Sequence, residues 1–208
     1  SQFWGKQDIP KMRKILGLNL LLAMGLALVF IFAAVTFPVQ IFNAFKAAPE
    51  ALNEGVTYLR IVCIGYFATA ITTAFDSSVC CSEKAALPFI VRAIGLLVNV
   101  VLNWILIFGR LGAPAMGVKG AAVATVIARF SELAVMLSAV YGRKMIQAAS
   151  FKELFTIPKE IVVKFFKTSS AVILNEMAWA LGTTAFSWVF ARISPEAIVA
   201  ITIVQNIE

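Results

Sequence analysis

The sequence contains no histidine and only three cysteines among its 208 residues. Cys80 and Cys81 are adjacent and Cys63 stands alone, so there is no Cys-x-x-Cys spacing and no His to complete a zinc site. Adjacent cysteines also fit neither ordinary disulfide geometry nor a redox motif. The pattern disfavours Cys/His metal or nucleophilic chemistry, and we expect the cysteines to act as small apolar side chains.

Charged residues are scarce as well. They make up 14% of the chain against 61% hydrophobic residues, whereas soluble domains contain roughly 25% charged residues. The segment from Ile15 to Phe45 has no Asp, Glu, Lys or Arg at all, and about 20 such residues cross the hydrocarbon core of a bilayer. This segment alone predicts an integral membrane protein.

The net charge of +7 does not indicate a nucleic-acid partner. The basic residues stand at the ends of apolar runs, not in a stripe with interleaved aromatic side chains. The sequence therefore predicts contact with the lipid bilayer and no contact with nucleic acid.

The apolar runs predict an all-α, polytopic helical bundle. Runs of this length without period-two alternation favour helices over a barrel. Five spans and the start of a sixth are predicted, at Ile15 to Phe37, Val56 to Val79, Pro88 to Gly109, Gly120 to Tyr141, Thr168 to Ala191 and from Ala197 to Ile207. The chain begins without Met and ends inside an apolar run, so we expect an internal part of a longer protein.

Lys and Arg alternate between the two sets of loops. Eleven fall in one set, which includes Lys84 and Lys152, and four in the other, which consists of Lys46, Arg110, Lys119 and Arg192. The positive-inside rule assigns the first set to the cytoplasm. Aromatic residues then fall at the outer interface, where their rings prefer to lie: Trp104, Phe108, Trp188 and Phe190.

The longest connection, Gly142 to Lys167, is basic and amphipathic, with lysines among residues such as Phe151 and Leu154. A helix lying on the anionic cytoplasmic leaflet would explain this composition. A plain linker between two bundles would explain it equally well.

Polar side chains inside the spans are costly and mark candidate functional positions. Asn99 and Asn103 lie four residues apart, so they share one helix face, about 16 and 22 Å above the cytoplasmic edge. Glu176 lies nine residues past Lys167, about 13 Å into the membrane, and no cationic partner stands one turn away on its own helix. Hydrogen bonds or ion pairs between helices are the structural alternative for all three.

Other polar or small residues in the spans favour structural roles. Arg129 and Glu132, three residues apart, are predicted to pair within one helix. Arg60, Asp76 and Arg92 lie near span ends, where snorkelling of the side chain to the interface is sufficient. The small residues from Gly117 to Thr125 predict close helix packing.

Three stretches resemble one family. NVVLNWILIFGRLGAPAMGVKGAAVATVIAR (Asn99 to Arg129) is similar to the fifth and sixth helices of multidrug and toxic compound extrusion (MATE) transporters. ILNEMAWALGTTAF (Ile173 to Phe186) resembles the seventh helix of these transporters. QFWGK (Gln2 to Lys6) resembles the loop that follows their second helix. CSEKAALP (Cys81 to Pro88) departs from the Gly-Asp turn common in the family.

The resemblance implies a twelve-helix transporter of two six-helix lobes. Residues 1–141 would belong to the N-terminal lobe, 142–167 to the connection between the lobes and 168–208 to the C-terminal lobe. The implied activity is export of drugs or other organic, often cationic, compounds in exchange for protons or sodium ions. No cofactor beyond the coupling ion is expected, and the full-length protein is expected to be a monomer in the plasma membrane.

The resemblance also implies roles for individual residues. Asn99, Asn103 and Thr125 match polar positions of the first lobe, and Glu176 matches the acid of helix seven that contributes to cation coupling, so it is a candidate sodium ligand. Some relatives have Asp where Asn103 stands, and the Asn removes one possible proton carrier.

Alternative functions remain open. A lipid-linked saccharide flippase of the same superfamily would need further basic residues in its cavity, because its ligand carries pyrophosphate. A membrane enzyme would need a nucleophile with a base, or a metal cluster, and the sequence offers neither. A noncatalytic scaffold would leave the deep Asn pair and Glu176 unexplained.

The orientation can be tested by cysteine labelling of the full-length protein in intact cells. In a cysteine-free background, Cys at position 46 should react with a membrane-impermeant reagent, whereas Cys at position 152 should react only after the cells are opened. Labelling of position 152 from outside would contradict the assigned orientation.

Overall fold

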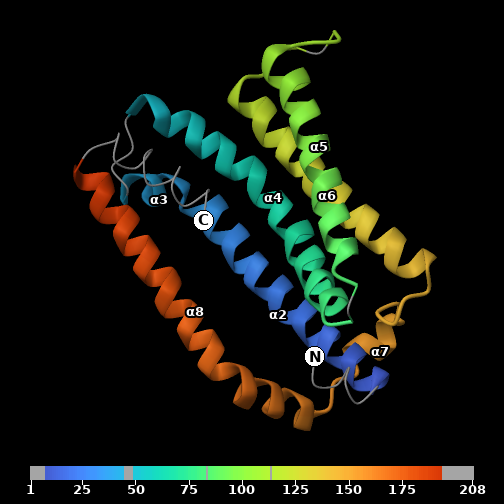
Figure 1. Ribbon diagram of the computed structural model, residues 1–208. Helices are drawn as coiled ribbons and strands as arrows, with labels where there is room; N and C mark the ends of the chain where they lie inside the picture. Colours follow the sequence, from blue (N-terminus) through green and yellow to red (C-terminus); the bar gives the residue numbers. More distant parts are fainter. Residues whose placement is uncertain (1–7, 45–48, 83, 113, 194–208) are drawn as a thin grey trace.

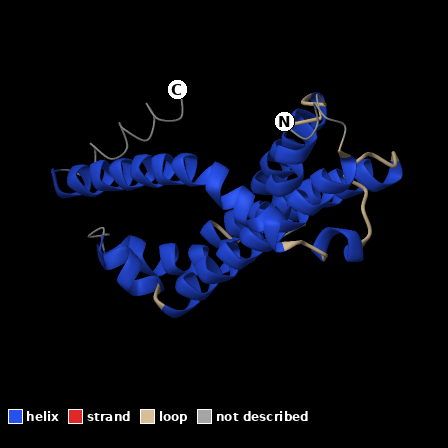
Figure 2. Ribbon diagram, turned by 90° about the horizontal axis from the view of Figure 1, so that it is seen from below, coloured by secondary structure: helices blue, strands red, loops and turns tan. Residues whose placement is uncertain are grey.

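The computed structural model describes residues 8–44, 49–82, 84–112 and 114–193, and these contain helices and loops only (Figures 1 and 2). The long helices are α2 (Ile9–Thr36), α4 (Pro49–Cys80), α5 (Ala86–Phe108), α6 (Val118–Gly142) and α8 (Lys159–Ile193). Two short helices, α3 (Pro38–Ala44) and α7 (Phe151–Phe155), lie in the connections. The all-α prediction is confirmed.

Four helices are long and apolar enough to cross a membrane: α2, α5, α6 and the Leu52–Cys80 part of α4. They coincide with the first four predicted spans. The fifth predicted span, Thr168 to Ala191, is helical within α8, but α8 does not reach the hydropathy of the other four. The predicted start of a sixth span at Ala197 lies outside the described residues.

Helix boundaries follow local sequence signals. The Asp8 carboxylate caps α2 by accepting a hydrogen bond from the Lys11 backbone N–H at 3.3 Å, and Pro10 occupies the first turn, where its missing N–H is not needed. The Lys11 side chain also bonds to this carboxylate and lowers the pKa of Asp8. At the other end α2 stops at Thr36, two residues before Pro38.

The buried core lies where the first half of α2, the end of α4, the start of α5 and the second half of α6 meet. Leu16 from α2, Val79 from α4, Val91 from α5 and Met136 from α6 are each at most 1% exposed and belong to one cluster. Toward the opposite end α2 and α4 diverge from the α5 and α6 pair (Figure 1). Large apolar side chains are exposed there, such as Phe32 (65%) and Phe108 (65%), as expected of surfaces that face lipid or further helices.

The connection after α6 does not form one amphipathic helix. Only Phe151–Phe155 is helical before Pro158, and the helix that begins at Lys159 is already α8. Leu154 is 3% exposed and packs on α2, where Gly17 leaves the space: a Cβ at Gly17 would lie 1.8 Å from the Leu154 carbonyl oxygen. Of the two interpretations left open for this connection, one continuous helix does not form, and part of the apolar face is buried against protein.

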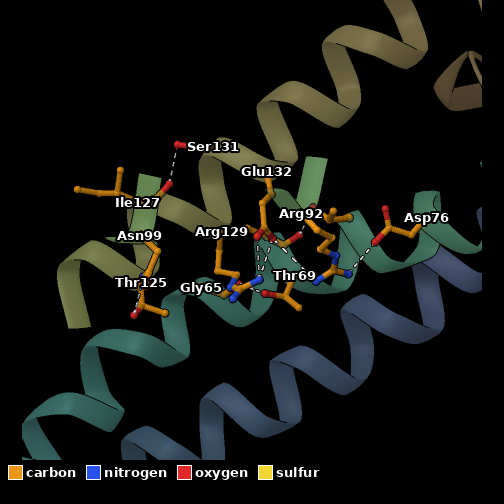
Figure 3. A network of polar contacts seen from close by, with 12 residues as sticks. Gly65, Thr69, Asp76, Arg92, Asn99, Thr125, Ile127, Arg129, Ser131 and Glu132 are labelled. Atoms are coloured by element: carbon orange, nitrogen blue, oxygen red, sulfur yellow. Dashed lines mark hydrogen bonds and ion pairs between the residues drawn. The ribbon is translucent and has the colours of Figure 1, made fainter. Parts of the chain in front are cut away.

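Four charged side chains from three helices form an ion-pair network (Figure 3): Asp76 on α4, Arg92 on α5, and Arg129 and Glu132 on α6. Arg129 Nη1 lies 3.0 and 2.9 Å from the two carboxylate oxygens of Glu132, which confirms the predicted pair. Arg92 Nη2 lies 2.6 Å from Asp76 Oδ2, and Arg92 Nη1 lies 4.0 Å from Glu132 Oε2. Asp76 and Arg92 therefore pair across helices, a contact that their positions near span ends did not predict.

The network needs a glycine at position 95. Glu132 is 3% exposed and lies directly over Gly95 of α5, where a Cβ would be 2.1 Å from Glu132 Oε1 and 2.3 Å from its Cγ. The small residues of α6 serve the same close packing, since Gly120, Ala122, Ala124 and Ala128 are all buried. The predicted packing role is confirmed for Gly120, Ala122 and Ala124, whereas Gly117 is exposed.

Gly95→Ala should destabilise the full-length protein by about 1–3 kcal/mol, because the new methyl group displaces Glu132 from its ion pair. Thermal unfolding of the purified protein in detergent measures the effect. Gly25→Ala is the matched control: nothing lies within 4 Å of a Cβ at Gly25, so helix propensity should raise stability by up to about 1 kcal/mol. Equal melting temperatures for the two variants would contradict the role of Gly95.

Candidate functional site

Three of the four predicted site residues meet between α5 and α6. The Asn103 amide nitrogen donates to Asn99 Oδ1 at 2.9 Å, as the four-residue spacing predicts. The Asn99 amide nitrogen donates to Thr125 Oγ1 at 3.4 Å, and the Thr125 hydroxyl donates in turn to the Ala121 carbonyl at 2.9 Å. Figure 3 shows Asn99 and Thr125 side by side across the two helices. We call these three residues the Asn cluster.

The Asn cluster keeps an unused hydrogen-bond acceptor. Asn103 Oδ1 is buried and has no partner among the described residues. Buried amide oxygens are normally paired, so an unpaired one in a membrane helix carries a free-energy cost that needs an explanation. This oxygen can accept a hydrogen bond from a ligand N–H or contribute an oxygen ligand to a cation.

The Asn cluster and the ion-pair network form a continuous polar column. Thr125 and Arg129 are one turn apart on α6, and Asn99 and Gly95, the glycine beneath Glu132, are one turn apart on α5. Glu132 lies seven residues past Thr125, about 10 Å nearer the C-terminal end of α6. The column contains two carboxylates and two guanidinium groups, so its charges balance.

Glu176 is not part of this arrangement. It lies on an exposed stretch of α8, and none of the ion pairs or hydrogen bonds in the described part of the chain involves it. Among the described helices, α8 contacts only α2. The described residues also contain no group of three or more Asp, Glu, His or Cys side chains that could hold a metal ion together. The sodium site at Glu176 remains a prediction.

A pocket between α2 and α4 was not predicted. Its volume is about 420 Å³ and its lining is apolar apart from Tyr66, Thr69 and Thr73 on α4. These three residues have i, i+3, i+7 spacing, a one-face pattern that could have been noticed in the sequence. The Thr69 hydroxyl is already used, because it donates to the Gly65 carbonyl at 3.0 Å. The pocket offers an apolar surface and few free polar groups.

Comparisons with known proteins agree on one family. The MatE family model matches residues 1–105. Multidrug resistance protein NorM of Vibrio cholerae is 30% identical over 154 residues, which cover 71% of this chain and 34% of that protein. Uncharacterized transporter YisQ of Bacillus subtilis is 24% identical over 212 residues, which cover 100% of this chain and 45% of that protein.

A solved structure has the same fold. It is described as the inward-facing conformation of a multidrug resistance MATE family transporter of the MOP superfamily, and it matches with a TM-score of 0.80 at 18% sequence identity over 97% of this chain and 45% of that chain. The chain thus spans less than half the length of these relatives. With four membrane-crossing helices and a family model that matches half of its residues, the chain is part of a multi-pass plasma-membrane protein and belongs to the MatE family.

Proposed function

We propose that the full-length protein is a secondary active antiporter that exports drugs or other organic, often cationic, compounds in exchange for protons or sodium ions, and that it acts as a monomer. The observation that carries this proposal is the Asn cluster with its unpaired Asn103 oxygen in a pair of membrane helices. The names of the relatives, multidrug resistance proteins among them, support the same function.

The Asn cluster suits a site that binds and releases its ligand. Amide and hydroxyl groups hydrogen-bond an ammonium or other N–H group without the permanent charge that would hold a cation too tightly. The Arg92 and Arg129 guanidinium groups below it are each paired with a carboxylate, so they do not impose an unbalanced positive charge on a cation nearby. A cationic compound is therefore the better match for this site.

Glu176 is proposed to provide the carboxylate for ion coupling. A carboxylate in the middle of a membrane helix is costly unless it is protonated, paired or bound to a cation, and its exposed position here leaves it available to proton or sodium ion. In this proposal Glu176 acts in the second lobe, while the Asn cluster acts in the first.

The flippase alternative receives less support. A pyrophosphate ligand needs unpaired basic groups within the cavity. The arginines of the ion-pair network, Arg92 on α5 and Arg129 on α6, both have carboxylate partners. The family assignment also argues against the membrane-enzyme alternative.

Asn103→Leu in the full-length transporter should lower substrate export about tenfold, because a lost hydrogen bond to a charged ligand is worth about 1.5 kcal/mol. Expression and thermal stability should change little. Export into energised vesicles, normalised to folded protein, measures the effect. Val100→Leu, at a 57% exposed position of the same helix, is the control. Normal export per folded molecule with reduced stability would instead assign Asn103 a structural role.

Glu176→Gln should abolish gradient-driven export while the protein inserts and purifies normally, because the amide keeps the size of the side chain but cannot exchange a proton. The measurement is substrate export by reconstituted protein under an imposed proton or sodium gradient. Glu160→Gln makes the same chemical change in the first turn of α8 and should leave export intact. Equal gradient-driven rates for wild type and Glu176→Gln would remove Glu176 from the coupling mechanism.

A further inference from the structure

A second pocket lies between the first turns of α2 and the short helix α7. These two elements lie side by side (Figure 1). Its volume is about 370 Å³, within the range of small-molecule sites in proteins. The residues that determine its character are Arg13 and Lys14 from α2 and Ser150, Lys152 and Glu153 from the α7 region. None of them belongs to the Asn cluster or to the ion-pair network.

The charge in this pocket is unbalanced. Arg13, Lys14 and Lys152 face a single carboxylate, Glu153. The Glu153 carboxylate already accepts two hydrogen bonds. Its Oε2 lies 3.2 Å from Arg13 Nη1 and 3.3 Å from the Ser150 backbone nitrogen. Neither Lys14 nor Lys152 has an ion-pair partner in the described part of the chain. Two ammonium groups therefore remain available to an anion.

The pocket is also preorganised. Arg13 Nε donates to the Ile146 carbonyl at 2.9 Å while its Nη1 holds Glu153, so the guanidinium is fixed between the two sides of the pocket. Leu154 is buried against α2, which anchors α7 beside the basic residues. An anion that binds here does not have to order the connection first.

The position of the pocket relative to the membrane indicates whether the anion is a lipid headgroup or a free ion. Lys14 is the last charged residue before the charge-free run that starts at Ile15, so the pocket opens where the hydrocarbon core begins, at the level of the lipid headgroups. Immediately beyond, α2 exposes Leu21 (47%) and Leu22 (41%), which can contact acyl chains. The orientation assigned from the loop charges places this end in the cytoplasmic leaflet, where anionic lipids are enriched.

We propose that the pocket formed by Arg13, Lys14, Ser150 and Lys152 binds the phosphate headgroup of an anionic phospholipid of the cytoplasmic leaflet. The bound phosphate links α2 to α7 through the two free lysines and so holds the connection that leads into α8. This role does not depend on the substrate or the coupling ion of the transporter.

The experiment titrates the purified full-length protein with phosphatidylglycerol and measures bound lipid by native mass spectrometry. Each basic group near an anionic headgroup contributes roughly fivefold in affinity, so Lys14→Gln/Lys152→Gln should weaken binding about 25-fold. The matched control, Lys84→Gln/Lys144→Gln, removes two lysines from the same side of the membrane outside the pocket and should change the affinity less than twofold. Both variants should keep the melting temperature of the lipid-free protein, since the substituted side chains lie outside the core.

Two further titrations separate the possible ligands. Phosphatidylcholine, which carries a phosphate but no net charge, should bind weakly and equally to wild type and both variants. Inorganic phosphate at the same concentration should not displace phosphatidylglycerol. Equal weakening by the two double variants, or none by the pocket variant, would overturn the proposal. Displacement of the lipid by inorganic phosphate would also overturn it and assign the pocket to a free anion.

Discussion

The buried carboxylate of Glu132 is the group on which the packing of α4, α5 and α6 depends. Its two oxygens bind Arg129 on its own helix, Arg92 approaches from α5, and Arg92 in turn holds Asp76 of α4. A lone charge at this depth would cost several kcal/mol, and removal of one partner would leave such a charge behind. These ion pairs therefore fix how the three helices pack against one another. That packing leaves no room for a side chain larger than that of glycine at position 95.

This constraint determines where polar atoms remain for function. The ion-pair network balances its charges, whereas the Asn cluster one turn away leaves the Asn103 oxygen without a partner. The closely packed small residues of α6 bring the backbone of α5 within reach, so the Asn99 amide meets the Thr125 hydroxyl at 3.4 Å. Asp76 Oδ1 in the ion-pair network is also buried without a hydrogen-bond partner, but it belongs to a carboxylate that is already paired with Arg92. The unpaired Asn103 oxygen belongs to an uncharged cluster and is the one we propose to meet the transported compound.

The sequence was sufficient to predict what depends on spacing along one helix. The first four spans, the bond between Asn99 and Asn103, and the pair of Arg129 with Glu132 follow from apolar run length or from i, i+3 and i, i+4 geometry. It was insufficient for contacts between helices, such as Asp76 with Arg92, because these depend on packing. It also could not place Leu154, because amphipathicity does not distinguish lipid from a neighbouring helix as the apolar partner.

The central claim is that the Asn cluster lies on the path of the transported compound. The most direct test places a single cysteine at position 103 of the otherwise cysteine-free full-length transporter and measures its rate of modification by a small cationic thiol reagent. The account predicts that the cysteine reacts and that a saturating cationic substrate slows the reaction several-fold. No reaction, or a rate that the substrate leaves unchanged, would contradict it.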